Sequence, residues 1–372
     1  MKKIVFIWAK FAPYHIDRIE AVKNLLGHEF EVAGIQKVKS ADTYAWAEVE
    51  SHPGFSITTL FPDDRNMPFW KTLFLLCRET LRPGVHHVFT CEYQSAYTFF
   101  MACILRLFGR RVFVMTDSKF DDKPRFLWRE IGKVFLYLPY NGAFASGRRT
   151  AEYLHFLGFR KRPAIEGYNT LSLERVRRNA AIAPAPEGPP FHQRHFLTIA
   201  RFIPKKNLPM LIRAYALYRQ MAGDAARDLH LCGSGPEENS LRSLVAELGL
   251  HGVIFDGFLQ EGGVAKLLGN SLALLLPSFD EQWGLVINEA LAMGLPVICG
   301  DTVGARDALV KNAINGQAIE TDNPEGLARF MFQMGEDEQE WRRMALASCK
   351  LAPLGDVSRF AAGINELIRA CP

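Results

Sequence analysis

Residues 272–299 of this chain are LALLLPSFDEQWGLVINEALAMGLPVIC. The apolar run 272–276 is typical of a strand that is buried on both faces. A helix is predicted from about Gly284 to Gly294, because glycine commonly terminates helices, and the apolar run 296–299 is the next strand. Strand, crossover helix and parallel strand in so short a stretch predict a right-handed βαβ unit, and therefore an open α/β sheet.

The loop between this strand and this helix, residues 277–283, is predicted to lie at the carboxyl ends of the strands, where open α/β sheets bind ligands. It leads into a helix N-terminus that favours an anion such as a phosphate, and Gly284 permits close approach of a backbone. Glu281 and Glu289 add two carboxylates, which suit a ligand that carries hydroxyls as well as phosphates. The alternative is that Glu281 is an acid favoured by the helix dipole and that Glu289 is a solvated helix residue.

Length and composition are those of a globular protein with two domains. The chain has 372 residues, of which 48% are hydrophobic and 23% charged. Its seven cysteines form no C-x-x-C motif, so we expect neither a metal site nor a disulfide framework. The first apolar run is too short for a signal peptide, and no run of about eighteen apolar residues predicts a membrane span. The expected location is the cytoplasm.

The charge is unevenly distributed along the chain. Residues 1–170 contain 24 Lys and Arg against 17 Asp and Glu, and the remainder contains 20 against 23. A basic first half favours an anionic partner, such as the inner face of a membrane or a lipid-phosphate acceptor, although a solvated surface would have the same composition. The modest net charge of +4 and the lack of a basic stripe argue against a nucleic-acid binder. No pattern in the chain indicates an oligomeric state.

Alternating strands and helices on both sides of a proline-rich segment predict two domains, each with a parallel sheet covered on both faces. Residues 1–178 form the predicted first domain, 179–195 a linker, 196–352 the second domain and 353–372 a segment with a last helix. One further helix, predicted over residues 125–137, mixes basic and aromatic residues. Core packing is favoured for it over a membrane surface, because its apolar residues do not form one clean face.

A group of cations precedes the central unit in the second domain. Arg201 ends a predicted strand and Lys206 follows five residues later; cations at such a junction bind phosphate, since Arg contacts two oxygens at once and Lys supplies a compact charge. The alternative is a solvated basic loop. Gly233 lies in CGSGPE, residues 232–237, a tight turn for which a structural role and a ligand contact stay equally open.

These patterns together resemble the donor site of the GT-B retaining glycosyltransferases of family 4, the glycosyl transferases group 1. PSFDEQWGLVINEALAMGLPVI carries the E-x7-E of that family, Arg201 and Lys206 match its R-x4-K, and CGSGPE and FDGFLQ match two further segments. The resemblance implies the GT-B fold, an α/β architecture of two Rossmann-like, doubly wound parallel-sheet domains facing a central cleft, with the last helix crossing back to the first domain. It also implies a hexosyl-type glycosyltransferase that uses a nucleotide sugar and a glycan or lipid-linked acceptor, with no metal or other cofactor.

By the same resemblance, Arg201 and Lys206 neutralise the diphosphate of the donor, and Glu289 holds the ribose hydroxyls. Glu281 holds hydroxyls of the transferred sugar and is one of two catalytic candidates, the other being Asp117. The remaining donor-binding candidates contribute groups near the base and the phosphates: Gly233, Phe258, Leu259, Gly284, Leu285 and Val286.

The acceptor-binding candidates follow predicted strands of the first domain: Tyr14, His15, Arg18, Glu92 and Asp117. Asp117 begins a charged loop, for which mutually screened surface charges are the alternative. The chain departs from the family in two places. It lacks the paired glycines that many members have after the first strand, and Asn207 stands where the family often has glycine. For the family histidine near the sugar the candidates are His15, His86 and His87, of which His86 and His87 fit strand entry better.

Two rival functions stay open. One is a nucleotide-sugar 2-epimerase on the same fold, which consumes its donor without an acceptor, and the other is a non-catalytic GT-B binding protein. The E-x7-E and R-x4-K patterns favour a transferase. Bacterial polysaccharide or lipid-linked oligosaccharide synthesis is the setting that the resemblance implies.

Overall fold

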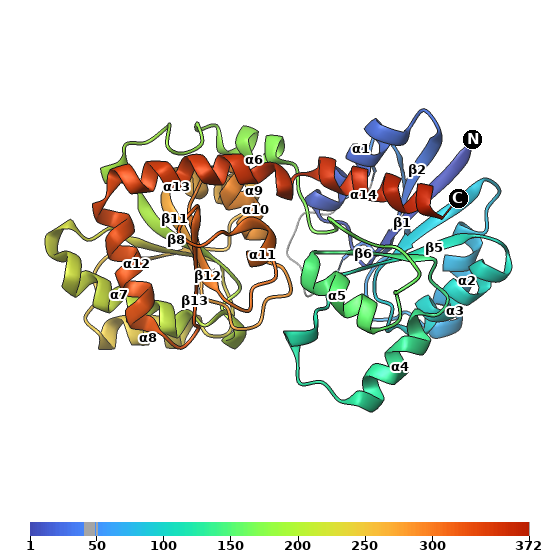
Figure 1. Ribbon diagram of the computed structural model, residues 1–372, viewed down its shortest axis with the longest axis horizontal. Coiled ribbons are helices and arrows are strands. Elements are labelled where there is room, and N and C mark those ends of the chain that lie inside the picture. Colours follow the sequence, from blue (N-terminus) through green and yellow to red (C-terminus); the bar gives the residue numbers. More distant parts are fainter. Residues whose placement is uncertain (41–48, 50, 372) are drawn as a thin grey trace. The chain divides into compact units, whose positions relative to one another are not determined.

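The computed structural model of the protein describes residues 1–40, 49 and 51–371, and the chain divides into two compact units (Figure 1). The first unit comprises Met1–Leu171 and Val357–Pro372, and the second comprises Ser172–Asp356. Each unit contains one parallel β-sheet with helices packed on it, as the alternating sequence pattern predicts.

The sheet of the first unit has seven parallel strands in the order β3-β2-β1-β4-β5-β6-β7. The strand bounds are Lys2–Trp8 (β1), Phe30–Val38 (β2), Ser56–Phe61 (β3), Val85–Thr90 (β4), Arg111–Thr116 (β5), Gly142–Ala145 (β6) and Ala164–Glu166 (β7). The helices are Pro13–Leu26 (α1), Phe69–Thr80 (α2), Ala96–Leu107 (α3), Leu127–Tyr137 (α4), Arg148–Phe156 (α5) and Val357–Ala370 (α14).

Both faces of this sheet are covered, which explains its apolar strands. Phe6 and Trp8 of β1 lie in a core layer shared with α1 and α14, whereas Val5 and Ile7 lie in the layer shared with α2, α3 and α5. Successive side chains of a strand point to opposite faces, so β1 supplies both layers. The last helix, α14, therefore belongs to the core of the first unit although it ends the chain.

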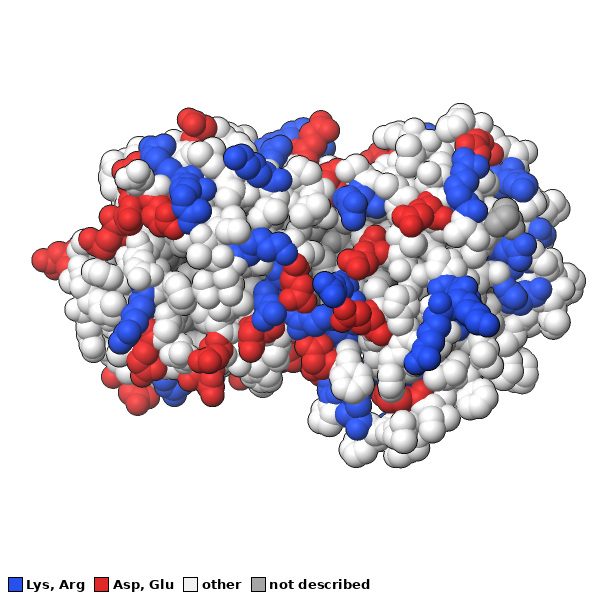
Figure 2. Space-filling model, in the orientation of Figure 1, with Lys and Arg blue, Asp and Glu red and all other residues white. Residues whose placement is uncertain are grey.

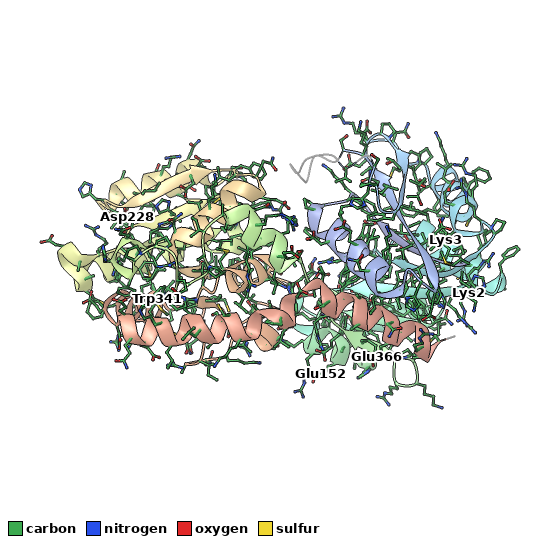
Figure 3. All side chains as sticks on the ribbon, turned by 90° about the horizontal axis from the view of Figure 1, so that it is seen from above. Lys2, Lys3, Glu152, Asp228, Trp341 and Glu366 are labelled. Carbon is green, nitrogen blue, oxygen red and sulfur yellow. The ribbon has the colours of Figure 1, made fainter. Side chains whose placement is uncertain are left out.

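The second unit has six parallel strands in the order β10-β9-β8-β11-β12-β13. The strand bounds are His195–Ile199 (β8), Leu229–Cys232 (β9), Val253–Gly257 (β10), Ser271–Leu276 (β11), Val297–Gly300 (β12) and Gly316–Ile319 (β13). The helices are Leu173–Ala180 (α6), Leu208–Ala222 (α7), Glu238–Glu247 (α8), Glu261–Asn270 (α9), Leu285–Ala292 (α10), Arg306–Leu309 (α11), Pro324–Glu336 (α12) and Glu338–Leu351 (α13). Trp341 of α13, labelled in Figure 3, is buried and donates its indole N–H to the carbonyl of Leu272 at 2.9 Å.

The domain boundary lies earlier than the sequence predicts. Helix α6 packs against α9 and α10 and belongs to the second unit, so the first unit ends at Leu171 rather than at 178. The proline-rich segment 179–195 is also part of the second unit. Its Arg194 is 2% exposed and donates to the carbonyls of Pro189, Gly269, Ser271 and Glu187, at 2.7 to 3.3 Å. These hydrogen bonds hold the segment against the unit, which proline content alone could not indicate.

Core packing of α4, which the sequence favours, holds for only part of the helix: Tyr137 lies in the core layer of α2, α3 and α5, and Val134 and Leu136 pack against that layer. Only Glu130 and Tyr137 of this helix are buried, while Leu127, Trp128 and Phe135 are 60% to 72% exposed. Lys133 donates to the Glu130 carboxylate at 2.9 Å, and the Tyr153 hydroxyl donates to the same carboxylate. Glu130 and Lys133 of α4 thus face the unit, whereas Leu127, Trp128 and Phe135 face outward.

Candidate functional site

The predicted donor residues lie at the point of the second sheet where the strand order reverses. Strands β8 and β11 are neighbours in the sheet but not in the sequence, and such a switch point is where open α/β sheets bind ligands. Arg201 and Lys206 follow β8, and Glu281 follows β11. The carboxyl ends of parallel strands lie at the same edge of the sheet, so the loops after β8 and β11 are neighbours. The ion pair between Lys206 and Glu281 joins these two loops.

The Lys206–Glu281 ion pair is the central contact of this site. Both side chains are largely buried, with 13% and 16% of their surface exposed, and Lys206 donates directly to a carboxylate oxygen of Glu281. The neighbouring pair, Lys205 and Asp280, is longer at 3.6 Å and more exposed. Arg201 is exposed, and within the described residues no side chain pairs with its guanidinium. The site therefore combines one unpaired cation with one cation whose charge is balanced by a carboxylate.

Main-chain hydrogen bonds hold the loop that carries Glu281. The Phe279 N–H donates to the carbonyl of Lys205 at 3.1 Å, and the Gly304 N–H donates to the carbonyl of Glu281 at 3.1 Å. Trp283 donates its indole N–H to Asn288 of α10 at 3.0 Å. Contacts to three different elements position the carboxylate of Glu281 before any ligand is present.

Helix α10 begins directly beside this loop. Gly284 is its N-cap residue and has a φ of 98°, in the left-handed region that favours glycine. Leu285 and Val286 occupy the first turn, where backbone N–H groups have no partner within the helix. The start of α10 lies beside Glu281, which is paired with Lys206, and a helix start with free N–H groups near a cation is suited to an anion.

Glu289 lies in the second turn of α10, near Arg175 of α6. Burial raises the pKa of the Glu289 carboxyl to about 7, the Arg175 guanidinium opposes that rise, and the Glu261 carboxylate adds to it. Arg175 is itself paired with Glu261 at 2.6 Å. Glu289 is therefore not a freely solvated helix residue, and the alternative interpretation given in the sequence analysis is excluded for it.

The pKa of Glu289 predicts how stability depends on pH. Because this pKa is higher in the folded protein than the ordinary value of 4.5, the unfolded chain ionises first, and Glu289 makes the fold less stable as pH rises from 4.5 to about 7. We expect Glu289→Gln, which cannot ionise, to be about 1 to 3 kcal/mol more stable than the wild type at pH 8 and nearly equal to it at pH 4.5. Denaturant unfolding at both pH values measures this difference. A difference that does not change with pH would contradict it.

The glycines of CGSGPE have a structural role. A Cβ on Gly233 would lie 1.8 Å from the carbonyl oxygen of Ala200, and one on Gly235 would lie 2.5 Å from that of Phe202. The loop after β9 thus packs backbone to backbone against the loop that starts at Ala200 and carries Arg201. After β10, Phe258 is 47% exposed and Leu259 is half-buried.

Gly233→Ala is expected to destabilise the protein by about 4 kcal/mol or more, because the methyl group overlaps Ala200 and the φ of 143° does not suit alanine. The control is Gly262→Ala in α9, where a Cβ meets nothing within 4 Å, and it should stabilise the helix by up to about 1 kcal/mol. Chemical denaturation measures both free energies of unfolding. Similar values for the two variants would refute the close approach at Gly233.

Thr302 and Arg175 escaped the sequence analysis, and Asn207 entered it only as a departure from the family pattern. Asn207 has a φ of 56°, and its amide donates to the carbonyls of Pro277 and Thr321, so the left-handed backbone explains why the family glycine can be replaced by asparagine. Thr302, after β12, donates to the carbonyl of Ser278 at 3.2 Å. Arg201 was identified because it directly follows a strand of the sheet, and the same criterion would have identified Thr302. Arg175, in contrast, lies near Glu289 only because α6 packs against α10.

The candidates of the first unit divide into two groups, and the first group lies on α1. The helix begins at Pro13, so Tyr14, His15 and Arg18 are helical rather than in a loop. The Ala12 N–H donates to His15 Nδ1 at 3.0 Å, and burial together with Arg18 holds the pKa of His15 well below its usual value. Arg18 is 1% exposed and donates to the carbonyl of Thr170 at 2.9 Å. His15 and Arg18 thus serve the fold, and Tyr14 is more accessible.

The second group lies at the carboxyl ends of β4 and β5. Glu92 has a left-handed backbone with a φ of 59° and forms an ion pair with Lys37 of β2. Asp117 is half-buried directly after β5. Burial raises the pKa of the Cys91 thiol to about 12, and the charges of Glu92, Lys37 and Asp117 all act on it, so these groups surround one point of the edge. His86 and His87 enter β4 at the opposite edge, as the sequence indicates.

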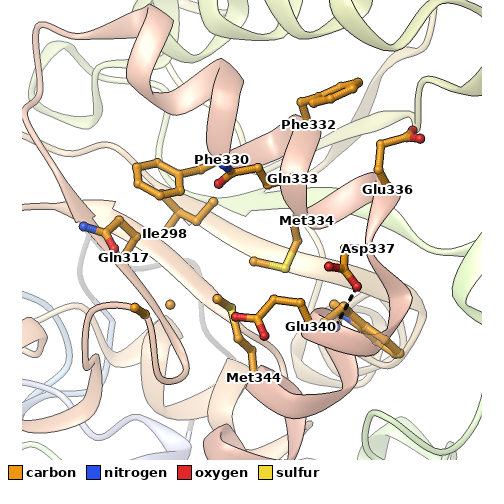
Figure 4. Close-up of a pocket in the computed structure, with 13 residues that line it drawn as sticks. Ile298, Gln317, Phe330, Phe332, Gln333, Met334, Glu336, Asp337, Glu340 and Met344 are labelled. Carbon is orange, nitrogen blue, oxygen red and sulfur yellow. Dashed lines mark hydrogen bonds between the residues drawn. The ribbon is translucent and has the colours of Figure 1, made fainter.

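A separate cavity lies at the amino ends of β12 and β13, next to the junction of α12 and α13 (Figure 4). Its volume is about 490 Å³, and Asp337 accepts a hydrogen bond from the N–H of Glu340 at its rim. The predicted donor residues follow the carboxyl ends of strands, and the residues that line this cavity include none of them.

The match to a known protein family lies in the second unit. Residues 182–348 match the family described as Glycosyl transferases group 1. An uncharacterized glycosyltransferase of Methanocaldococcus jannaschii is 32% identical over 139 residues, which cover 37% of this chain and 34% of that protein. The N-acetyl-alpha-D-glucosaminyl L-malate synthase of Bacillus anthracis is 32% identical over 147 residues, which cover 39% of this chain and 37% of that protein. The chain thus aligns with little more than a third of the length of these relatives.

The similarity to solved structures extends over the whole chain. Anabaena HepE in complex with UDP aligns with 100% of both chains, with a TM-score of 0.73 and 16% sequence identity. A likeness at this identity establishes the fold. The predicted GT-B fold, with two Rossmann-like parallel-sheet units, is therefore confirmed.

Proposed function

We propose that the protein is a retaining, metal-independent hexosyl-type glycosyltransferase of family 4, which moves a sugar from a nucleotide diphosphate sugar to an acceptor hydroxyl. The observation that carries this proposal is the cluster at the β8–β11 switch point, where the Lys206–Glu281 ion pair lies beside the start of α10 and Arg201 follows β8 in the same loop as Lys206. The Glycosyl transferases group 1 match over residues 182–348 includes all of these residues and supports the proposal. HepE, which shares the fold, has been solved with UDP.

The proposed roles follow from the charges at this site. Arg201 and Lys206 bind the diphosphate together with the N–H groups of Leu285 and Val286. Glu289 accepts hydrogen bonds from the ribose hydroxyls, and its ionisation near pH 7 makes this contact dependent on pH. The backbone around Phe258 and Leu259 meets the base, at the end of β10.

Binding of the diphosphate has a direct consequence for Glu281. In the unliganded protein Lys206 is paired with Glu281, and a phosphate oxygen competes for the same ammonium group. When Lys206 turns to the phosphate, the Glu281 carboxylate becomes available to accept hydrogen bonds from hydroxyls of the transferred sugar. Donor binding thus exchanges the ion pair of Lys206 for one with the phosphate, while hydrogen bonds from hydroxyls replace Lys206 as the partner of the Glu281 carboxylate.

The transfer itself needs no protein nucleophile in this proposal. The bond from the acceptor oxygen to the anomeric carbon forms on the face from which the bond to the phosphate oxygen breaks, and the hydroxyl proton passes to that leaving phosphate. Arg201, Lys206 and the helix start offset the charge that develops on the leaving group, a task that a metal ion performs in other phosphate chemistry. Asp117 and Glu92 are the proposed acceptor contacts, because they keep carboxylates at the carboxyl edge of the first sheet.

The acceptor is proposed to be a glycan or lipid-linked sugar of bacterial polysaccharide or oligosaccharide synthesis, and the protein a cytoplasmic one in peripheral contact with the inner face of an anionic membrane. No helix in the part of the chain that the structure describes is long and apolar enough to cross a membrane. The basic first unit supports an anionic surface as partner.

A thermal-shift panel tests the donor site. UDP, GDP, ADP and TDP and their sugar conjugates are added with and without EDTA, and we expect one diphosphate to raise the melting temperature equally in both conditions. If no diphosphate stabilises the protein, the donor site is wrong; if stabilisation requires a divalent ion, metal independence is wrong. Consumption of the stabilising sugar conjugate without an acceptor would identify an epimerase instead.

A further inference from the structure

The outward face of α4 is an apolar surface with no partner in the described part of the chain. Five side chains form it, and we call them the α4 stripe: Leu127, Trp128, Ile131, Phe135 and Leu138. They are 51% to 72% exposed, and the spacing 127, 131, 135 and 138 places them along one side of the helix. Full burial of such a side chain is worth about 1.5 to 3 kcal/mol, so leaving five in water favours an occupant.

Helix α4 carries apolar residues on two sides: Val134, Leu136 and Tyr137 pack toward the core of the unit, and the stripe lies on the outer side. Its inner side carries Glu130, which is 4% exposed and is paired with Lys133 and Arg125, at 2.9 and 3.7 Å. Tyr153 of α5 closes this group through its hydrogen bond to Glu130. Because these polar contacts hold the inner side in place, α4 cannot turn to bury its stripe without breaking a buried charge network.

Basic residues flank the stripe at both ends. Lys123 is exposed before α4, and the Arg129 guanidinium lies 5.0 Å from the centre of the Trp128 ring. At the other end Arg162 donates to the carbonyls of Tyr137 and Tyr140, at 2.6 and 2.8 Å, which places the exposed residues 160–161, an Arg and a Lys, next to the end of the helix.

The acids of this region do not offset these cations at the surface. Residues 118–138 contain three acids, Asp121, Asp122 and Glu130, and each is paired with a cation of the same unit. In Figure 2 the surface over α4 is largely white, with both blue and red side chains at its borders. The exposed charge around the stripe is therefore positive.

The geometry points to the α4 stripe as the surface with which this protein binds an anionic lipid bilayer. A single helix at the periphery of its unit (Figure 1), with Trp, Phe and Leu outward and cations at both ends, matches a helix that lies in the plane of a membrane interface. Aromatic rings that stack with Arg suit the headgroup region of a bilayer. Each exposed Lys or Arg near the surface adds electrostatic attraction to anionic lipid. This inference assigns a surface to the membrane contact of the proposed function but does not depend on the transfer reaction.

Vesicle co-sedimentation of the full chain tests the stripe. We expect the wild type to bind phosphatidylcholine vesicles that contain one third phosphatidylglycerol, and Ile131→Glu with Phe135→Glu to bind them at least about tenfold more weakly. The control is Leu346→Glu on α13, because Leu346 is 52% exposed and lies in the other unit. Melting temperatures of all variants report whether they are folded, and their response to the nucleoside diphosphate should equal that of the wild type.

A second pair of variants tests the charge. Arg160→Glu with Lys161→Glu should weaken binding about tenfold, whereas Lys350→Glu, an exposed lysine of α13, should not. Lack of wild-type binding, equal binding to pure phosphatidylcholine vesicles, or an equal effect of the control variants would overturn the proposal. So would a dimer in sedimentation velocity that the Ile131 and Phe135 substitutions dissociate, because the stripe would then cover a second copy. A diphosphate response without vesicle binding rejects the membrane surface alone.

Discussion

Replacement of Glu281 by Ala is expected to lower the turnover number about 100-fold or more, while the dissociation constant of the nucleoside diphosphate changes little. The carboxylate contacts the sugar in the proposed complex, whereas the diphosphate is held by Arg201, Lys206 and the start of α10. Loss of Glu281 also frees Lys206 from its ion pair, so the cation that binds phosphate remains in place. Steady-state kinetics and titration calorimetry measure the two quantities separately.

The matched control for this variant is Asp280→Ala. Asp280 precedes Glu281 in the same loop but pairs with Lys205 at 3.6 Å and is about one third exposed. We expect its effect on turnover to stay within a few-fold, as is usual for a solvent-screened pair. An equal loss of turnover and of diphosphate affinity in Glu281→Ala would exclude a role of this residue in positioning the sugar.

The second large effect is expected from the cations of the site. Arg201→Ala combined with Lys206→Ala should raise the dissociation constant of the nucleoside diphosphate about 100-fold or more and remove its thermal stabilisation, because charge-assisted contacts to both phosphates are lost. Lys206→Ala by itself also leaves the Glu281 carboxylate without its partner at a largely buried position, so this variant should melt at a lower temperature than Arg201→Ala.

Lys205→Ala is the control for these substitutions. Lys205 neighbours Lys206 in the short helical turn Pro204–Lys206, and its ion pair with Asp280 is half-exposed. Diphosphate affinity should fall by no more than a few-fold in this variant. A loss as large as that of Lys206→Ala would mean that the R-x4-K spacing does not define the phosphate contacts.

The elements of the stretch 272–299 were predicted correctly because the sequence signals that define them lie within the stretch itself. A continuous apolar run, a loop and a glycine-terminated helix define β11, α10 and β12 without reference to the rest of the chain. The grouping of Arg201, Lys206 and Glu281 also followed from the sequence, since parallel strands must end at one edge. Short elements with weak patterns were missed: β7 has three residues, none of them buried, and β13 has four.

The errors concern segments whose position depends on distant partners. The proline-rich segment has the composition of a linker, yet Arg194 ties it to the carbonyls around β11. The segment with α4 has both charged and apolar residues, and its periodicity does not tell which side faces the unit. The group of Glu130, Lys133 and Tyr153 decides that question, because it holds two charged residues of α4 on the inner side. Arg18 likewise looked available for a ligand until Thr170 supplied its partner.

The sequence by itself determined the two parallel sheets, the switch-point site of the second unit and the residue types that suit a phosphate next to hydroxyls, because periodicity and strand-end position are properties of short segments. The tertiary structure alone decided that Lys206 is paired with Glu281, that burial shifts the pKa of Glu289 to about 7 and that α4 leaves a stripe of apolar side chains exposed. Each of these depends on which groups meet across many residues of chain, and charge pairing and desolvation act only through such contacts.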